Sequence, residues 1–99
     1  MLEEVVVGLR SHENSGSALV VYPNPAKNLL TVDFSGLSRD VREIVLADML
    51  GAPVYSSGAL TGKKSRISFS AGGIANGVYV LSVKTDDGLQ INRRVAIVH

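Results

Sequence analysis

The residue types that carry out catalysis are scarce in this sequence, and their positions do not suit it. A serine nucleophile needs a rigidly held histidine as its base, and the two histidines, His12 and His99, lie toward the two ends of the chain. We expect His99 to be a frayed terminal residue or part of a purification tag, not a ligand. The sequence contains no cysteine, which excludes disulfides and thiolate metal sites. Neither histidine is therefore a good candidate for a catalytic base.

The acidic residues offer oxygen ligands of the kind that Ca²⁺ prefers, but their spacing does not form a calcium loop. Asp33 is one such residue, while Asp48 and the pair Asp86-Asp87 stand in contexts typical of turns, where a carboxylate accepts hydrogen bonds from nearby amides. Neither Gly36 nor Gly72-Gly73 leads from a strand into a helix with a lysine, so no phosphate-binding loop is present. We predict no metal ion and no other cofactor.

Charge and aromatic content exclude some classes of partner. Ten basic and nine acidic residues give a net charge of +1, which supplies no long-range field for a phosphate backbone, so nucleic-acid binding is not predicted. The sequence has no tryptophan to form a carbohydrate platform, and we expect Tyr79 in the core with its hydroxyl on a backbone partner. Two basic clusters, Lys63-Lys64-Arg66 and Arg93-Arg94, suit anionic lipid headgroups or an acidic partner; solvated strand faces that discourage edge pairing are the favoured interpretation.

Short β-strands must position these residues, because apolar and polar residues alternate between turn signals along most of the chain. A helix also fits residues 41–50, but their β-branched residues and the turn that follows favour a strand. Seven strand regions with almost no helix indicate an all-β, immunoglobulin-like antiparallel β-sandwich, although the immunoglobulin cysteine pair and tryptophan are absent. The predicted strands are residues 18–22, 29–34, 41–49, 53–56, 66–70, 77–83 and a closing run that ends at 98.

The two-residue period of a strand assigns a core face to each predicted strand. On the second strand, Thr31 falls on the outward face. Both faces of residues 77–83 are mostly apolar, so we expect this strand inside a sheet and not at its edge. The residues predicted to point inward are Leu30, Val32, Phe34, Ile44, Leu46, Ile67, Phe69, Tyr79, Leu81 and Val83.

The register of the closing hairpin follows from parity, since Val83 and Ile91 should share the core face. A three-residue loop at 86–88, with its glycine in the left-handed conformation, meets that condition. The same register places Arg93 beside Leu81 on the core side. Either the arginine extends its charged group out at the sandwich margin, or a bulge shifts the register of the strand before Val95.

The chain length suits a single domain that buries about two-thirds of its unfolded surface. We predict that residues 1–17 are a linker or the end of a preceding cargo region, and that residues 18–99 form the domain. The patch Val5-Val6-Val7 fits an extra strand, the end of a preceding domain or a disordered segment. No apolar run approaches the roughly 20 residues of a membrane-spanning helix, and the N-terminal residues do not resemble a signal peptide, which would then lie in a longer parent protein.

Four segments in this order resemble the C-terminal sorting domain of proteins exported by the type IX secretion system of certain Gram-negative bacteria. They are residues 21–26, residues 44–51 with Val54 soon after, residues 73–81, and the closing run 93–98. Each segment is a loose pattern, but their order and spacing make the combination fairly specific. The motif residues that carry the resemblance are Pro23, Asn24, Pro25, Asp48, Gly51, Gly77 and Tyr79.

The resemblance implies a folded sorting signal, not an enzyme, carried by an exported cargo protein. In the family, a signal peptide takes the cargo into the periplasm, and an outer-membrane translocon with its shuttle components recognises the domain. A sortase-like peptidase then cuts in the linker and attaches the cargo to lipopolysaccharide at the cell surface. In this chain the cut would fall at Ser15, Gly16 or Ser17. Recognition by the translocon is expected on the final hairpin, through Arg93, Arg94, Val95, Ile97 and Val98.

Two other functions fit the same fold. The first is an uncleaved immunoglobulin-like structural or adhesive module that binds a partner or a sugar, and the second is a stabilising accessory domain of a secreted hydrolase. The mass of the mature surface protein distinguishes a sorting signal from a retained module, because only a signal is removed from the cargo. Open strand edges and the Val5-Val6-Val7 patch also predict a homodimer formed by strand addition or exchange.

Overall fold

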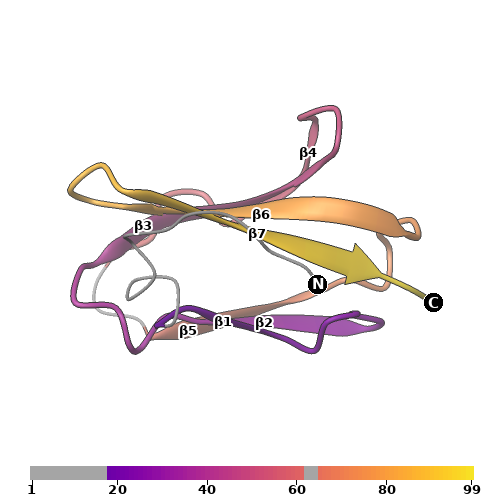
Figure 1. Ribbon diagram of the computed structural model, residues 1–99, viewed down its shortest axis with the longest axis horizontal. Helices are drawn as coiled ribbons and strands as arrows, with labels where there is room; N and C mark the ends of the chain where they lie inside the picture. The colour runs from indigo at the N-terminus through magenta and orange to yellow at the C-terminus, as the bar shows by residue number, and fades with distance from the viewer. Residues whose placement is uncertain (1–17, 62–64) are drawn as a thin grey trace.

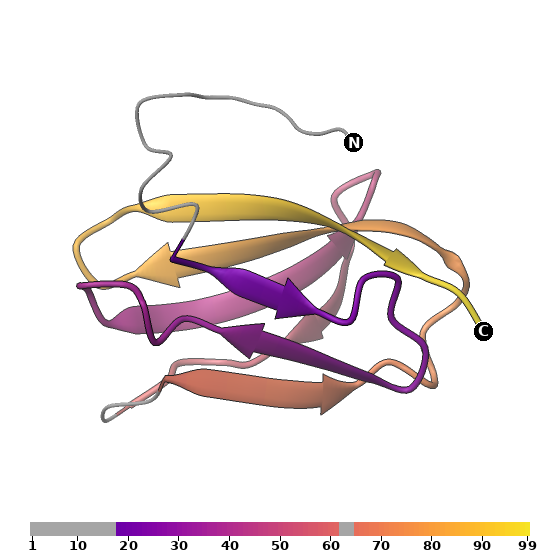
Figure 2. The ribbon, with the colours of Figure 1, turned by 60° about the horizontal axis from the view of Figure 1, so that its bottom comes forward.

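Two antiparallel sheets packed face to face make up the described part of the chain (Figures 1 and 2). The structure is a computed structural model that describes residues 18–61 and 65–99. Its strands are β1 (Val20–Tyr22), β2 (Leu29–Asp33), β3 (Val41–Asp48), β4 (Pro53–Ser56), β5 (Arg66–Ser70), β6 (Gly77–Thr85) and β7 (Gln90–Ile97). One sheet has the order β1-β2-β5 and the other β4-β3-β6-β7, and these two ranges contain no helix. The predicted immunoglobulin-like sandwich of about seven strands is confirmed.

Some strand boundaries differ from the prediction by one or two residues. Pairing of β1 begins at Val20 opposite Asp33, two residues later than expected, because β2 ends there. The carboxylate of Asp33 accepts hydrogen bonds from the N–H and hydroxyl of Ser35 at 3.0 and 2.7 Å, which turns the chain out of the sheet. In contrast to β1, which is shorter than predicted, β6 is longer: it continues to Thr85, beyond the predicted end at residue 83.

The core lies between the two sheets and follows the predicted alternation. Ile67 is only partly buried, and the other residues predicted to point inward are buried. Each fully buried Leu, Ile or Val side chain stabilises the fold by about 1.5–3 kcal/mol. Thr31 lies on the outer face, as the alternation predicts, but this strand, β2, is more than half-buried because neighbouring strands cover Thr31: it is 7% exposed, and its hydroxyl lies 2.8 Å from that of Ser68. A central strand thus buries a polar residue on its outer face by pairing it.

Two aromatic contacts add to the core. The hydroxyl of Tyr79 donates to the backbone oxygen of Ala75 at 2.5 Å while its ring is buried, as predicted, and the ring lies beside Gly77. The rings of Tyr55 and Phe69 stack with centroids 3.8 Å apart and planes 4° apart. This second contact joins β4 of one sheet to β5 of the other, and burial raises the pKa of the Tyr55 hydroxyl. The stack was not predicted from the sequence.

The predicted register of the β6–β7 hairpin is confirmed. Val83 pairs with Ile91 and Leu81 with Arg93, with no register shift along the pairing. Gly88 has a φ of +95°, the left-handed conformation that the three-residue loop requires. Strand β6 lies between β3 and β7, so it is an interior strand as expected.

The strands run between two ends of the sandwich (Figure 2). We call one of them the hairpin end; it holds the start of β1, the β2–β3 loop (34–40) and the β6–β7 loop (86–89). A 3.0 Å hydrogen bond from Asp86 N–H to Asp40 O joins these two loops. The motif end holds the turn at 23–25, the β3–β4 turn, the loop at 71–76 and residues 98–99. Ala18, which packs against Gly36, and the last residues therefore lie at opposite ends.

Candidate recognition site

Strand β7 carries most of the residues predicted to contact a translocon, and the fold exposes them unequally. Val95 and Ile97 are fully buried, Arg93 is half-buried, and Arg94 and Val98 are exposed. In the folded domain, partners therefore reach Arg94 and Val98, whereas Val95 and Ile97 contribute core packing. Whether these residues bind the secretion machinery stays a prediction.

Arg93 lies on the core side opposite Leu81, and the strand continues in register past it. Of the two predicted solutions, the unbroken register excludes the bulge. The side chain lies at the sandwich margin, where its Nη1 donates to the backbone oxygen of Asn92 at 3.1 Å. Burial lowers the pKa of this guanidinium from its usual value, although an arginine stays charged at neutral pH.

The proline-asparagine-proline turn latches onto β7. Asn24 Nδ2 donates to the backbone oxygen of Arg94 at 3.1 Å, and the N–H of Ala96 donates to Asn24 Oδ1 at 3.0 Å. The Tyr22–Pro23 and Asn24–Pro25 peptide bonds are both cis. One side-chain amide thus satisfies a donor and an acceptor on the edge of a strand far away in the sequence.

Ala26 continues the same latch with its backbone. Its N–H donates to Ala96 O at 2.8 Å, its oxygen accepts from the N–H of Val98 at 2.9 Å, and it forms a parallel bridge with Ile97. The chain therefore leaves the β1 sheet and pairs with the last strand of the other sheet. The motif at 23–25 and the predicted recognition strand form one structural unit.

A second motif forms the β3–β4 turn at the same end of the sheet. Gly51 N–H donates to Asp48 O at 2.9 Å, and Gly51 has a φ of +91°, as the predicted turn requires. The Asp48 carboxylate accepts from the N–H groups of Leu50 and Ala52, both at 2.9 Å. The turn holds Leu50 out from the sheet, with 96% of the residue exposed.

The chain's last residue is docked, so the expectation that His99 is frayed is wrong. Its N–H donates to Asn76 Oδ1 at 3.0 Å, and its ring Nε2 lies 2.7 Å from the backbone oxygen of Ile74. Both partners belong to the loop at 71–76 that precedes β6. Side-chain amides at 24 and 76 thus hold the end of β7 from two sides.

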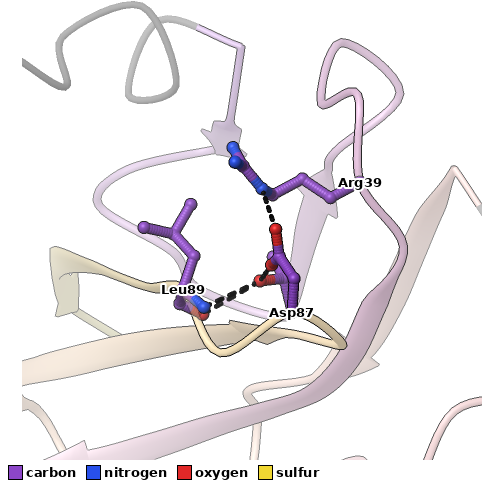
Figure 3. A network of polar contacts seen from close by, with 4 residues as sticks. Arg39, Asp87 and Leu89 are labelled. Atoms are coloured by element: carbon purple, nitrogen blue, oxygen red, sulfur yellow. Dashed lines mark hydrogen bonds and ion pairs between the residues drawn. The ribbon is translucent and has the colours of Figure 1, made fainter.

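The hairpin end is held by charge (Figure 3). Arg39 Nε donates to Asp87 Oδ2 at 2.8 Å, and the other oxygen of Asp87 accepts from the hydroxyl of Thr85. The Thr85 hydroxyl also accepts from the N–H of Leu89 at 3.0 Å. The hydrogen bond from Thr85, and after it the contacts of Arg39, lower the pKa of Asp87 to about 2.

The carboxylates of Asp48 and Asp87 therefore stabilise turns, as predicted. Across residues 18–61 and 65–99, no three His, Cys, Asp or Glu side chains lie together as a metal site would require. Several predictions fall outside the described residues and are not tested: the cleavage region Ser15, Gly16 and Ser17, together with His12, Lys63, Lys64 and the Val5-Val6-Val7 patch.

Comparison with known families supplies the identity of this arrangement. Residues 20–98 match the family described as the secretion system C-terminal sorting domain. The chain belongs to this family. It is a sorting domain of type IX secretion, which implies a secreted protein that interacts with the type IX machinery, and the family is one of signals, not of catalysts.

Other comparisons add little to the identity of the sorting domain. No curated protein matches it. Among solved structures, the crystal structure of CopC from Methylosinus trichosporium OB3b is similar, with 16% sequence identity and a TM-score of 0.43 over 80% of this chain and 90% of that one. A likeness this weak carries no functional argument. In the described part of the sorting domain, no helix is long and apolar enough to cross a membrane.

The sorting domain concentrates its exposed apolar side chains at the motif end, which sequence reasoning did not find. Of the eight exposed large hydrophobic residues in the described ranges, only Val20 lies at the hairpin end. A usable signal was present, because the β3–β4 turn places Met49 and Leu50 where turns usually carry polar residues. The other seven are Tyr22, Leu29, Met49, Leu50, Val54, Val78 and Val98, with exposures from 39% to 96%.

Proposed function

We propose that the outer-membrane translocon and its shuttle components read the motif end of this sorting domain, with Arg93, Arg94 and Val98 on the adjoining strand as further contacts. The observation that carries this proposal is the concentration of exposed apolar residues there. Clustered exposed apolar side chains are a usual mark of a protein contact surface. Here Met49, Leu50 and Val78 lie within the motifs at 48–51 and 77–79 that the family resemblance rests on, and Tyr22 directly precedes the motif at 23–25.

The second part of the proposal concerns processing. Residues 18–99 are the folded signal, residues 1–17 are the linker or the end of the cargo region, and a sortase-like peptidase cuts at Ser15, Gly16 or Ser17. The position of Ala18 supports this, because the linker joins the sandwich at the hairpin end. A peptidase working there does not collide with a translocon bound at the motif end. The cargo passes through the periplasm and is attached at the cell surface.

A fusion experiment tests sufficiency and processing together. Residues 1–99 are attached to an exported fluorescent protein in a bacterium with type IX secretion. We expect fluorescence at the surface and a mature mass that lacks everything after the linker. A surface protein that keeps the sandwich would support the uncleaved module instead, and fluorescence retained in the periplasm would contradict the sorting function.

Substitutions locate the recognition surface better than a truncation of residues 93–99, because the truncation also removes the buried core residues Val95 and Ile97. The variant Leu50→Ser with Val98→Ser changes two exposed residues at the motif end. Val20→Ser is the matched control, since Val20 and Val98 have similar exposures of 49% and 53%. We expect the double variant to leave cargo in the periplasm and the control to secrete normally. Equal secretion by both would remove the motif end from the proposal.

A further inference from the structure

The outer edge of β7 is covered along only half of its length. The even-numbered residues at the end of the chain turn their backbone groups away from β6. This orientation follows from a set of hydrogen bonds to residues 24–26, made by Arg94 O, by the N–H and O of Ala96 and by the N–H of Val98. By the same alternation, both backbone groups of Gln90 and of Asn92 and the N–H of Arg94 also face outward, and Asn92 O accepts from Arg93 Nη1 at 3.1 Å. Within residues 18–61 and 65–99, nothing supplies the other four groups with a hydrogen-bond partner. We call residues 90–94 the open edge.

The side chains along the open edge are polar and positive. Gln90, Asn92 and Arg94 are exposed on the outer face, and Asn92 Oδ1 accepts from Gln90 Nε2 at 3.1 Å and from Ser82 Oγ at 2.9 Å. Exposed Lys84 pairs with Gln90. Strand β7 contains two arginines and no acidic residue. A segment laid beside this edge therefore meets basic groups without a competing carboxylate on the strand itself.

We propose that the open edge binds an extended acidic segment of a partner protein by strand addition. Natural proteins usually block such edges, and a half-blocked edge leaves a short docking row. The covering residues 24–26 already run parallel to β7 and stop where the open edge begins, so an added strand continues an existing row of hydrogen bonds. Its carboxylates face Arg94 on the outer side. The inference deepens the proposed function and rests on it for the partner, a component of the secretion machinery.

Amide hydrogen exchange on the purified 99-residue chain tests binding directly. The probe is an eight-residue peptide that alternates threonine and glutamate, and the control peptide alternates threonine and lysine. We expect the acidic peptide to slow exchange at the amides of Asn92 and Arg94 about tenfold, since each gains a backbone hydrogen bond worth roughly that factor. The control peptide should leave both rates unchanged, and added salt should weaken the acidic peptide's effect.

Two variants separate backbone pairing from charge. Asn92→Pro removes the outward N–H while the β6 ladder keeps its bonds, and Asn92→Ala is its control because it loses the same side chain but keeps the N–H. We expect about tenfold weaker binding of the acidic peptide to Asn92→Pro than to Asn92→Ala. Arg94→Glu changes an exposed side chain, so it should fold like the parent domain, lose binding of the acidic peptide and gain binding of the lysine peptide.

Several results would overturn the inference. One is equal binding by Asn92→Pro and Asn92→Ala, and another is an Arg94→Glu variant that still prefers the acidic peptide. A third is slow amide exchange at Asn92 and Arg94 in the free protein, which would mean that the open edge is already occupied. Light scattering would then identify the occupant: a dimer mass indicates a second copy, and a monomer mass indicates the chain itself. If Arg94→Glu abolishes peptide binding but cargo still reaches the surface, strand addition is not used in sorting, while the proposed sorting function stands.

Discussion

At the hairpin end, the ion pair between Arg39 and Asp87 joins the β2–β3 loop to the last hairpin, whereas at the motif end neutral amides of Asn24 and Asn76 hold the last strand. The first kind of contact depends on pH and ionic strength, and the second does not. The motif end also carries nearly all the exposed large apolar side chains of the described residues.

This difference separates two tasks. A surface that a partner must recognise keeps its shape best when its supporting hydrogen bonds do not titrate, because it then presents the same contacts in every compartment. The hairpin end needs only to hold the loops together. We therefore expect mutations at the two ends to have similar effects on stability when they remove similar packing or strain, and different effects on sorting.

The largest expected effect on stability comes from truncating a core side chain near the motif end. Ile97→Ala removes a fully buried side chain between β6 and the latch residue Ala26, and should lower the free energy of unfolding by about 3–4 kcal/mol. Ile91→Ala, on the same strand near the hairpin end, starts from 8% exposure and should cost less. Urea denaturation of the two variants measures the ranking. A larger loss of unfolding free energy for Ile91→Ala would mean that the core contacts of β7 near the hairpin end stabilise the fold more than those near the motif end.

The next effect tests the latch itself. Asn24→Ala removes both side-chain hydrogen bonds to β7 and should cost about 1–2 kcal/mol of unfolding free energy. Asn24→Asp keeps the acceptor for Ala96 N–H but loses the donor to Arg94 O, so its effect should be intermediate. Faster amide exchange at Ala96 in Asn24→Ala, with unchanged exchange at Ile91, would localise the loss. Uniformly faster exchange would instead show that the latch supports the whole sandwich.

A matched pair of glycines compares the two ends directly. Gly51 at the motif end and Gly88 at the hairpin end have φ values of +91° and +95°, and a Cβ on either meets open space. Replacing each by alanine should therefore cost about 1–2 kcal/mol for the left-handed backbone and nothing for packing. We expect equal losses of stability by thermal unfolding but impaired sorting only for Gly51→Ala. Impaired sorting in both would mean that stability, not the motif end, limits secretion.

Much of the fold could be predicted because strand alternation and turn chemistry are local. The hairpin register followed from two apolar residues and one loop glycine, and it placed Arg93 opposite Leu81 correctly. The Asp48 turn was equally readable, since aspartate and glycine stand at the positions that the turn needs. The burial of Thr31 was not predicted, because alternation alone does not say which outer faces neighbouring strands will cover.

The candidate site was less predictable because its contacts join residues far apart in the sequence. The resemblance singled out Asn24, but nothing local says that its amide reaches the edge of β7. His99 was assigned to a frayed end for the same reason, since its partners belong to the loop before β6. Burial of Val95 and Ile97 was implied by the predicted register, yet the same residues were also expected to contact the translocon. A residue should be assigned a binding role only after it is known whether its side chain points into the core or to the surface.

The smallest effect expected is in the titration of the hairpin end. The pKa of Asp87 is lowered to about 2 from 3.8, so its contribution to stability is complete above the unfolded value and is lost as the pH falls from about 4 to about 2. The hydrogen bond from Thr85 is the largest single cause, and Arg39 acts through both a hydrogen bond and its charge, so Thr85→Val and Arg39→Ala should each raise the carboxyl pKa. Carbon NMR titration of the Asp87 carboxyl measures both shifts. An unchanged pKa in either variant would contradict the contact that the variant removes. Secretion should be unchanged in Arg39→Ala, because we propose that the translocon binds the other end of the sandwich.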